Sequence, residues 1–136
     1  MKPSMRIGNR AEITITVTDD MCPSWDGAVV HPVYSTWSMG HHFELAGRKA
    51  VKDHLEDHEE SIGSHLSIDH IAPAPLGHQV RAVAEVTDLD PTTVVCELVA
   101  YHVRAEGDDR IIGRGRQVQR IIAKSKLASL IKRASR

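Results

Sequence analysis

The chain has 136 residues, of which 41% are hydrophobic, 26% charged and only 4% aromatic, and its net charge is −1. This length has room for one hydrophobic core, so we expect a single domain over residues 1–136, and the composition excludes a chain that is disordered throughout. No apolar run is long enough to span a bilayer, and no apolar stretch follows the N-terminal charges as it would in a secretory signal. The spacing of Cys22 and Cys96 is not that of a disulfide scaffold, so a cytoplasmic protein is predicted.

The N-terminal half predicts a strand, an irregular segment and one long helix. Residues 12–18 alternate aliphatic and polar side chains, which indicates a half-buried strand. Residues 19–35 contain two prolines and a glycine, and we interpret them as a loop or lid. Helical spacing of apolar residues begins near Ser38 and runs to about Leu55. The apolar stripe of this helix consists of Met39, Phe43, Ala46 and Ala50.

Four further strands follow, joined by short connections rich in turn-forming residues. The predicted strands are 61–72, 78–88, 92–105 and 110–122. Residues 124–136 form a basic tail or a short helix. Successive strands with short connections favour an antiparallel sheet. We therefore predict an α+β protein with the hotdog fold, in which a curved antiparallel sheet of about five strands wraps one long helix. A chain this small leaves sheet edges uncovered, which favours a homodimer.

The charge of the chain is distributed unevenly. The last 27 residues contain nine basic residues and no acidic one, so the remainder carries eight bases against eighteen acids. A basic end on an acidic body is typical of proteins that bind an anionic partner, either cofactor phosphates or nucleic acid, although a solvated basic tail is an alternative. The basic end contains no aromatic residue on which bases could stack, which argues against nucleic acid.

Glu44 is a candidate for acid–base or nucleophilic chemistry. It lies away from the apolar stripe, on a second helix face that includes Gly40 and Gly47. Glycines at these positions permit close approach of a ligand or of another backbone. A carboxylate on such a face would be partly removed from water, which makes it a usable base or nucleophile. The alternative is a surface glutamate that pairs with Arg48 one turn later.

His70 and Thr36 are the other two candidates. His70 shares the strand face of Ile62, Leu66 and Ile68, which should look toward the helix, and a neutral imidazole there can hydrogen-bond a carboxylate or move a proton. It could equally be a satisfied core histidine. Thr36 precedes the helix and is a natural N-cap, but its hydroxyl could instead face a pocket at the helix N-terminus, where backbone N–H groups attract a developing oxyanion.

The spacing of these residues resembles the fluoroacetyl-CoA thioesterase family over nearly the whole chain. Thr36 lies eight residues before Glu44, and His70 lies seven residues after the glycine of the turn that ends at Gly63. Several local strings are also similar to that family. They are Met5-Arg6-Ile7-Gly8, Val33-Tyr34-Ser35-Thr36, Ser61-Ile62-Gly63, the segment 70–77, and Ile112-Gly113-Arg114-Gly115.

The resemblance implies a hotdog homodimer that hydrolyses an acyl-CoA thioester at the subunit interface. It implies a catalytic triad of Thr36, Glu44 and His70, with Gly63 in the turn that approaches the thioester. CoA would enter as part of the substrate, and no separate cofactor is expected. The lid departs from the family, because fluoroacetyl-specific members carry phenylalanines just ahead of the threonine. The segment here reads Asp-Gly-Ala-Val-Val, which predicts a differently shaped acyl pocket and a different small or medium acyl group.

Several alternatives stay open at this level. Arg116 and Arg120, on the last predicted strand, are candidates to bind the CoA phosphates. His54 and His58 lie four residues apart and could join a metal site, but their segment lacks the glutamate of the HExxH pattern and no metal is predicted. A hotdog protein that binds acyl-CoA without hydrolysing it, or a dehydratase on the same scaffold, is also compatible with the pattern, because fold alone does not determine activity.

Overall fold

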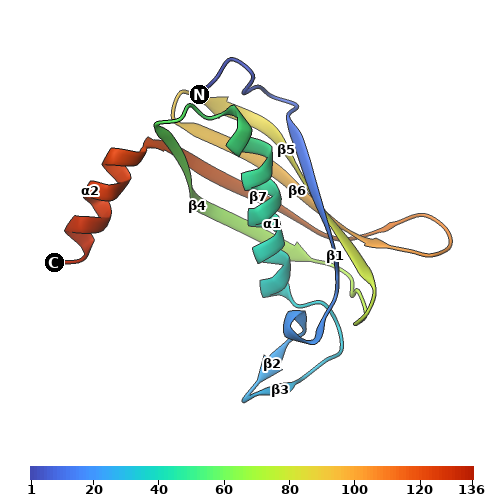
Figure 1. Cartoon of the computed structure of the whole chain (residues 1–136). Coiled ribbons are helices and arrows are strands. Elements are labelled where there is room, and N and C mark those ends of the chain that lie inside the picture. The colour runs from blue at the N-terminus through green and yellow to red at the C-terminus, as the bar shows by residue number, and fades with distance from the viewer.

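Helix α1 (Thr36–Val51) lies against one face of a five-stranded antiparallel sheet that curves around it (Figure 1). The computed structural model describes all 136 residues. The strands follow the spatial order β1-β5-β6-β7-β4, which leaves β1 and β4 at the two edges. Their bounds are β1 Arg10–Thr16, β4 Glu59–His70, β5 Gln79–Asp90, β6 Thr93–Val103 and β7 Arg110–Ala123. The predicted antiparallel sheet of five strands around one long helix is confirmed.

The core lies between α1 and the sheet. The predicted apolar stripe of the helix is buried: Met39, Phe43 and Ala46 are 0% exposed and Ala50 is 3% exposed. Gly113 and Gly115 of β7 lie directly beneath Met39 and Phe43, where a Cβ atom on either glycine would collide with those side chains. The two glycines therefore set how closely the helix can approach the sheet.

Helix α1 begins slightly earlier than the predicted start near Ser38, and its N-cap is Ser35, not Thr36. The helix begins at Thr36, because the hydroxyl of Ser35 accepts a hydrogen bond of 3.1 Å from the backbone N–H of Ser38 and caps the first turn. Thr36 is thus the first helical residue, and its hydroxyl is available for other contacts. At the other end, the predicted helix is too long, because a 3₁₀ turn (η2, Lys52–His54) follows Val51.

Strand β4 contains a bulge that the alternating pattern did not reveal. Its pairing with β7 shifts between Gly63 and His65, so Ser64 is an extra residue in the strand. One extra residue moves all preceding side chains to the opposite face. The prediction that Ile62 shares the helix-facing side of Leu66 is therefore wrong: Gly63 faces the helix there, and Ile62 lines a surface hollow with Arg120.

The segment predicted as a loop or lid contains a short β-hairpin. A 3₁₀ turn (η1, Asp19–Met21) leads into β2 (Ser24–Trp25) and β3 (Ala28–Val29), which project beyond the N-terminal end of α1 (Figure 1). Asp26 and Gly27 join the two strands with positive φ angles of 51° and 79°, the conformation that a tight two-residue hairpin requires. The hairpin presents Trp25 with 77% of its surface exposed.

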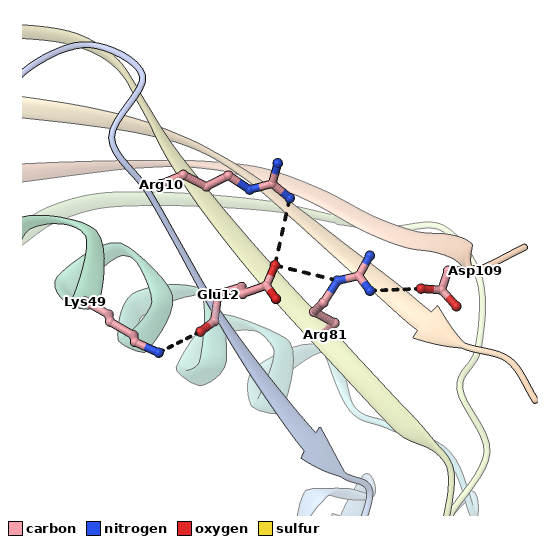
Figure 2. Close-up of polar contacts among 5 residues, drawn as sticks. All are labelled: Arg10, Glu12, Lys49, Arg81 and Asp109. Atoms are coloured by element: carbon pink, nitrogen blue, oxygen red, sulfur yellow. Dashed lines mark hydrogen bonds and ion pairs between the residues drawn. The ribbon is translucent and has the colours of Figure 1, made fainter.

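Polar contacts attach the edge strand β1 to the rest of the molecule. Figure 2 shows Arg81 of β5 between the carboxylates of Glu12 and Asp109, at 3.9 and 2.9 Å. Lys49 of α1 donates a hydrogen bond of 3.0 Å to the carbonyl oxygen of Glu12. These contacts connect α1, β1 and β5 on one side of the sheet.

The basic C-terminal segment forms helix α2 (Lys124–Ala134), which extends away from the sheet and has no buried residue (Figure 1). Neither α1 nor α2 has the length and apolar character needed to cross a membrane.

Candidate active site

Thr36 and His70 meet at the N-terminal end of α1. The hydroxyl oxygen of Thr36 lies 3.0 Å from Nδ1 of His70, at the end of β4. Thr36 reaches this position because Ser35 provides the helix cap. The backbone N–H groups of Thr36 and Trp37 have no hydrogen-bond partner within the chain, as is usual in a first helical turn. The end of the helix therefore presents two free donors beside a hydroxyl–imidazole pair.

Burial keeps the imidazole of His70 in its neutral form near neutral pH. The side chain is half-buried, and desolvation lowers its pKa below the ordinary value of 6.5, while a backbone hydrogen bond with Ala72 acts in the opposite direction. A neutral imidazole can accept a hydrogen bond or a proton, which a charged one cannot.

Glu44 lies beside the bulge of β4. A Cβ atom at Gly63 would be 3.2 Å from Oε1 of Glu44, so the glycine leaves the carboxylate room to lie against the strand. Glu44 is exposed in the single chain. The pairing of Glu44 with Arg48, the alternative interpretation of this glutamate, is absent, and Arg48 instead forms an ion pair of 2.9 Å with Glu60.

The same contacts show that α1 and β4 run side by side in opposite directions. Along the helix, Thr36 lies next to His70, Gly40 next to Ile68 and Leu66, and Glu44 next to Gly63. Thr36 and Glu44 are separated by eight residues, or about 12 Å along the helix axis. Within one chain, the structure thus brings together Thr36 with His70 and Glu44 with Gly63, but not Glu44 with His70.

Arg116 and Arg120 lie on the other face of the sheet. Gln117 and Gln119 extend toward α1, where Nε2 of Gln119 donates to the carbonyl oxygen of Gly47 at 3.0 Å. The two arginines alternate with these glutamines and are exposed, so they point away from the helix. The structure does not bring them near Thr36 or His70 of the same chain, and their contact with CoA stays a prediction.

The sequence reasoning did not identify Tyr34 and His42 as neighbours of the site. Both are buried, with 1% and 6% of their surfaces exposed, and Oη of Tyr34 lies 2.6 Å from Nδ1 of His42. A signal was present in the pattern, since His42 is three residues after Met39 and four before Ala46 and therefore adjoins the apolar stripe.

The histidines at the other end of α1 do not converge. His54 contacts the hydroxyl of Ser4 at 2.9 Å, and no group of three or more histidine, cysteine, aspartate or glutamate side chains is placed to hold a metal ion.

Comparison with known proteins defines the class to which this fold and site belong. A solved structure of a hypothetical protein from Thermus thermophilus, described as a thioesterase superfamily member, superposes with a TM-score of 0.90 and 38% identity, over 99% of this chain and 96% of that one. A hot-dog-like protein from Thermanaerovibrio acidaminovorans superposes with a TM-score of 0.80 and 17% identity, over 98% and 93% of the two chains. The chain is therefore a hotdog-fold member of the thioesterase superfamily.

The family follows from the sequence match. Residues 17–125 match the family model described as fluoroacetyl-CoA-specific thioesterase, and the chain belongs to this family. A variant of the fluoroacetyl-CoA-specific thioesterase FlK has the same fold, with a TM-score of 0.82 and 24% identity over 98% of this chain and 99% of that one. No curated protein sequence is significantly similar to the chain.

Proposed function

We propose that this protein hydrolyses a small or medium acyl-CoA thioester to the free acid and CoA, with Thr36, Glu44 and His70 at the interface of a homodimer. The observation that carries the proposal is the contact of Thr36 with His70 beside the free N–H groups of α1. This arrangement fits an acyl carbonyl, because two N–H donors at a helix N-terminus can stabilise the negative charge that develops on its oxygen.

A two-fold dimer would bring Glu44 to this centre. Strand β4 has a free edge along which a second copy can pair. Antiparallel pairing about an axis at Ser67 sets His65 opposite the partner's Asp69, and because Ser64 is an extra residue in the strand, Gly63 then lies opposite the partner's His70. Since Glu44 lies against Gly63, its carboxylate would face the imidazole of the other subunit. Each of the two sites would then take Thr36 and His70 from one protomer and Glu44 from its partner.

Exposed apolar side chains support an interface on this side of the molecule. Trp37 and Leu45, which follow Thr36 and Glu44 on α1, are 57% and 43% exposed, and Ile71 at the end of β4 is 61% exposed. Large exposed apolar groups on neighbouring elements favour burial in an interaction surface. Their burial in the dimer would also remove water from the carboxylate.

In the proposed reaction a C–O bond forms at the acyl carbon and the C–S bond to CoA breaks. Glu44 either attacks the carbonyl directly, and water then hydrolyses the acyl-enzyme, or it takes a proton from the attacking water. The proton that water releases goes to the departing thiolate. His70 and Thr36 orient the thioester and stabilise the charge that forms. No cofactor takes part besides the CoA of the substrate.

Solved structures of FlK support an acyl-CoA substrate, since they contain acetyl-CoA or fluoroacetate with CoA. Arg116 and Arg120 are the proposed phosphate contacts, reached by CoA where it leaves the interface. The acyl group is expected to differ from fluoroacetyl, because the hairpin ahead of Thr36 presents Trp25 and valines in place of phenylalanines. We place the reaction in the cytoplasm, a compartment in which the free thiols of Cys22 and Cys96 stay reduced.

The test is a screen for release of free CoA from short, branched, aromatic and halogenated acyl-CoAs. Glu44→Gln should lower kcat/KM by ~10²–10⁴-fold on the best substrate, whereas Glu85→Gln, an exposed glutamate on β5, should leave it unchanged. Activity of Glu44→Gln within a few-fold of the unmodified protein would refute the assignment. Binding of acyl-CoA without release of thiol from any substrate would indicate a binding protein, and hydration or dehydration of the acyl chain would indicate a dehydratase.

The shared site has a test of its own. Glu44→Gln and His70→Asn dimers should each be inactive, but after mixing and subunit exchange every heterodimer should contain one site with both native residues. Recovery of roughly a quarter of the native activity is expected from statistical mixing. No recovery, although mass measurement shows that heterodimers form, would mean that each site is built within one protomer.

A further inference from the structure

The proposed reaction leaves unused a buried polar pair that lies directly behind His70. Tyr34 and His42 are almost fully buried, and their 2.6 Å contact satisfies both the phenol and the imidazole. Burying two polar side chains costs free energy unless they bond each other, and an apolar pair of similar shape would fill the same space without that cost. The pair therefore calls for an explanation beyond packing.

The ring of Tyr34 neighbours both histidines. Its centroid is 5.7 Å from that of His42, with the rings nearly parallel at 8°, and 6.4 Å from that of His70, at an edge-on angle of 67°. His70 is thus held between two groups, the hydroxyl of Thr36 on one side and the ring of Tyr34 on another. Any movement of the Tyr34 ring changes the space available to the imidazole of His70.

The backbone on either side of Tyr34 is also held. Its N–H donates to the carbonyl oxygen of Ala74 at 2.9 Å, and the next N–H, of Ser35, donates to Met21 at 2.8 Å. With the backbone fixed in this way, rotation about the side-chain bonds is the remaining freedom of Tyr34. Burial of the ring and the contact of its hydroxyl with His42 together restrict that freedom.

A neutral His42 can accept the hydrogen bond of this contact. Burial and the neighbouring His41 lower the pKa of His42 below its ordinary value of 6.5. In the neutral ring with its proton on Nε2, Nδ1 accepts the hydrogen bond that the Tyr34 hydroxyl donates. Burial raises the pKa of Tyr34, so the phenol keeps the proton that it donates.

We propose that Tyr34 and His42 are positioning residues, whose buried hydrogen bond holds the Tyr34 ring against His70 and so fixes the imidazole toward Thr36. This role rests on the proposed thioesterase function, in which His70 faces the thioester. The pair does not touch the reacting atoms, and its effect passes through His70. The chemistry of the contact predicts which substitutions of His42 preserve the effect. A residue that can accept a hydrogen bond from the phenol of Tyr34 should preserve it, and an apolar residue should abolish it.

The experiment compares His42→Leu, His42→Gln and Tyr34→Phe with His54→Leu as the matched control, because His54 also contacts a hydroxyl but lies at the far end of α1. His42→Leu and Tyr34→Phe should lower kcat for the best acyl-CoA by ~10-fold with KM within about twofold, since a small misplacement of a catalytic group is costly. His42→Gln, whose amide oxygen can accept from Tyr34, should retain most of the activity. His54→Leu should match the native protein.

A second measurement does not depend on turnover. Nitrogen-15 NMR of the histidine side chains reports the tautomer and pKa of His70 directly. Both should change in His42→Leu and Tyr34→Phe and stay native in His42→Gln and His54→Leu. If His42→Leu does not fold, Tyr34→Phe and His42→Gln carry the test.

The outcomes separate the two proposals. Native kcat and native His70 signals in folded Tyr34→Phe and His42→Leu would overturn the positioning role and leave the pair a packing feature. If the unmodified protein hydrolyses no acyl-CoA but the His70 signals respond as expected, the thioesterase proposal fails while the coupling of the pair to His70 stands.

Discussion

Substituting alanine for Gly63 should reduce catalysis without reducing stability. The added Cβ would lie 3.2 Å from Oε1 of Glu44, which is closer than an ordinary carbon–oxygen contact. Glu44 is exposed and its carboxylate is the flexible end of the side chain, so it can move by a few tenths of an ångström without disturbing the core. Gly63 does not have a positive φ, and alanine therefore fits its backbone conformation.

The expected effects of Gly63→Ala on stability and on kcat/KM follow from this geometry. Alanine in a compatible backbone conformation stabilises the folded state by about 0.4–1 kcal/mol through the unfolded chain, which offsets the tight contact and leaves the melting temperature nearly unchanged. Displacing the carboxylate from the thioester should lower kcat/KM by ~10–10²-fold. Ser64→Ala, in the same bulge but without contact to Glu44, is the control and should keep native activity.

Release of free CoA and thermal unfolding measure the two effects separately. A double-mutant cycle with Glu44→Gln tests whether Gly63→Ala acts through the carboxylate. If it does, Gly63→Ala should not lower kcat/KM further in a protein that already carries Glu44→Gln. Native kcat/KM for Gly63→Ala, or additive losses in the double variant, would refute the reasoning.

Three further predictions concern the helix N-terminus, pH and the core. Thr36→Val keeps the branched shape but removes the hydroxyl, and should lower kcat by ~10²-fold with a native melting temperature; unchanged kcat would exclude a role for the hydroxyl. Burial lowers the pKa of both His42 and His70, so near and below pH 6.5 the unfolded chain binds more protons than the folded protein. The melting temperature should therefore fall as the pH is lowered from 7 to 5.5. A melting temperature that does not change over this range would contradict the prediction. Gly115→Ala would push a Cβ into the Ser67 carbonyl oxygen beneath α1 and should destabilise the fold by about 1–3 kcal/mol in denaturant unfolding; native stability would contradict that packing.

Figure 1 shows the position of α1 relative to the edge strand β4. Helix α1 and the edge strand β4 lie on the same side of the molecule, and no other element of the chain covers them there. Along this edge Thr36 contacts His70, and the exposed Glu44 lies beside Gly63. The proposed shared site therefore makes the oligomeric state the property to measure beside activity.

Local patterns in the sequence were enough to predict the main elements and to identify the candidate residues. Alternation in the strands and the stripe from Met39 to Ala50 are local patterns with periods of about 2 and 3.6 residues, which burial on one face imposes on any such element. The start of the helix could not be placed from pattern alone, because Ser35, Thr36 and Ser38 can all cap, and the choice of Ser35 depends on how the preceding segment is held.

The grouping of the candidate residues follows from contacts between elements that are distant in the chain. The bulge at Ser64 turns Gly63 toward Glu44, and the antiparallel course of α1 and β4 puts Thr36 at His70 and keeps Glu44 about 12 Å away along the helix. The buried hydrogen bond between Tyr34 and His42 likewise depends on the backbone around Tyr34, which is held by hydrogen bonds to Ala74 and Met21. Contacts between elements far apart in the chain leave no periodic signal, which is why the sequence could identify candidate side chains but could not show which of them meet.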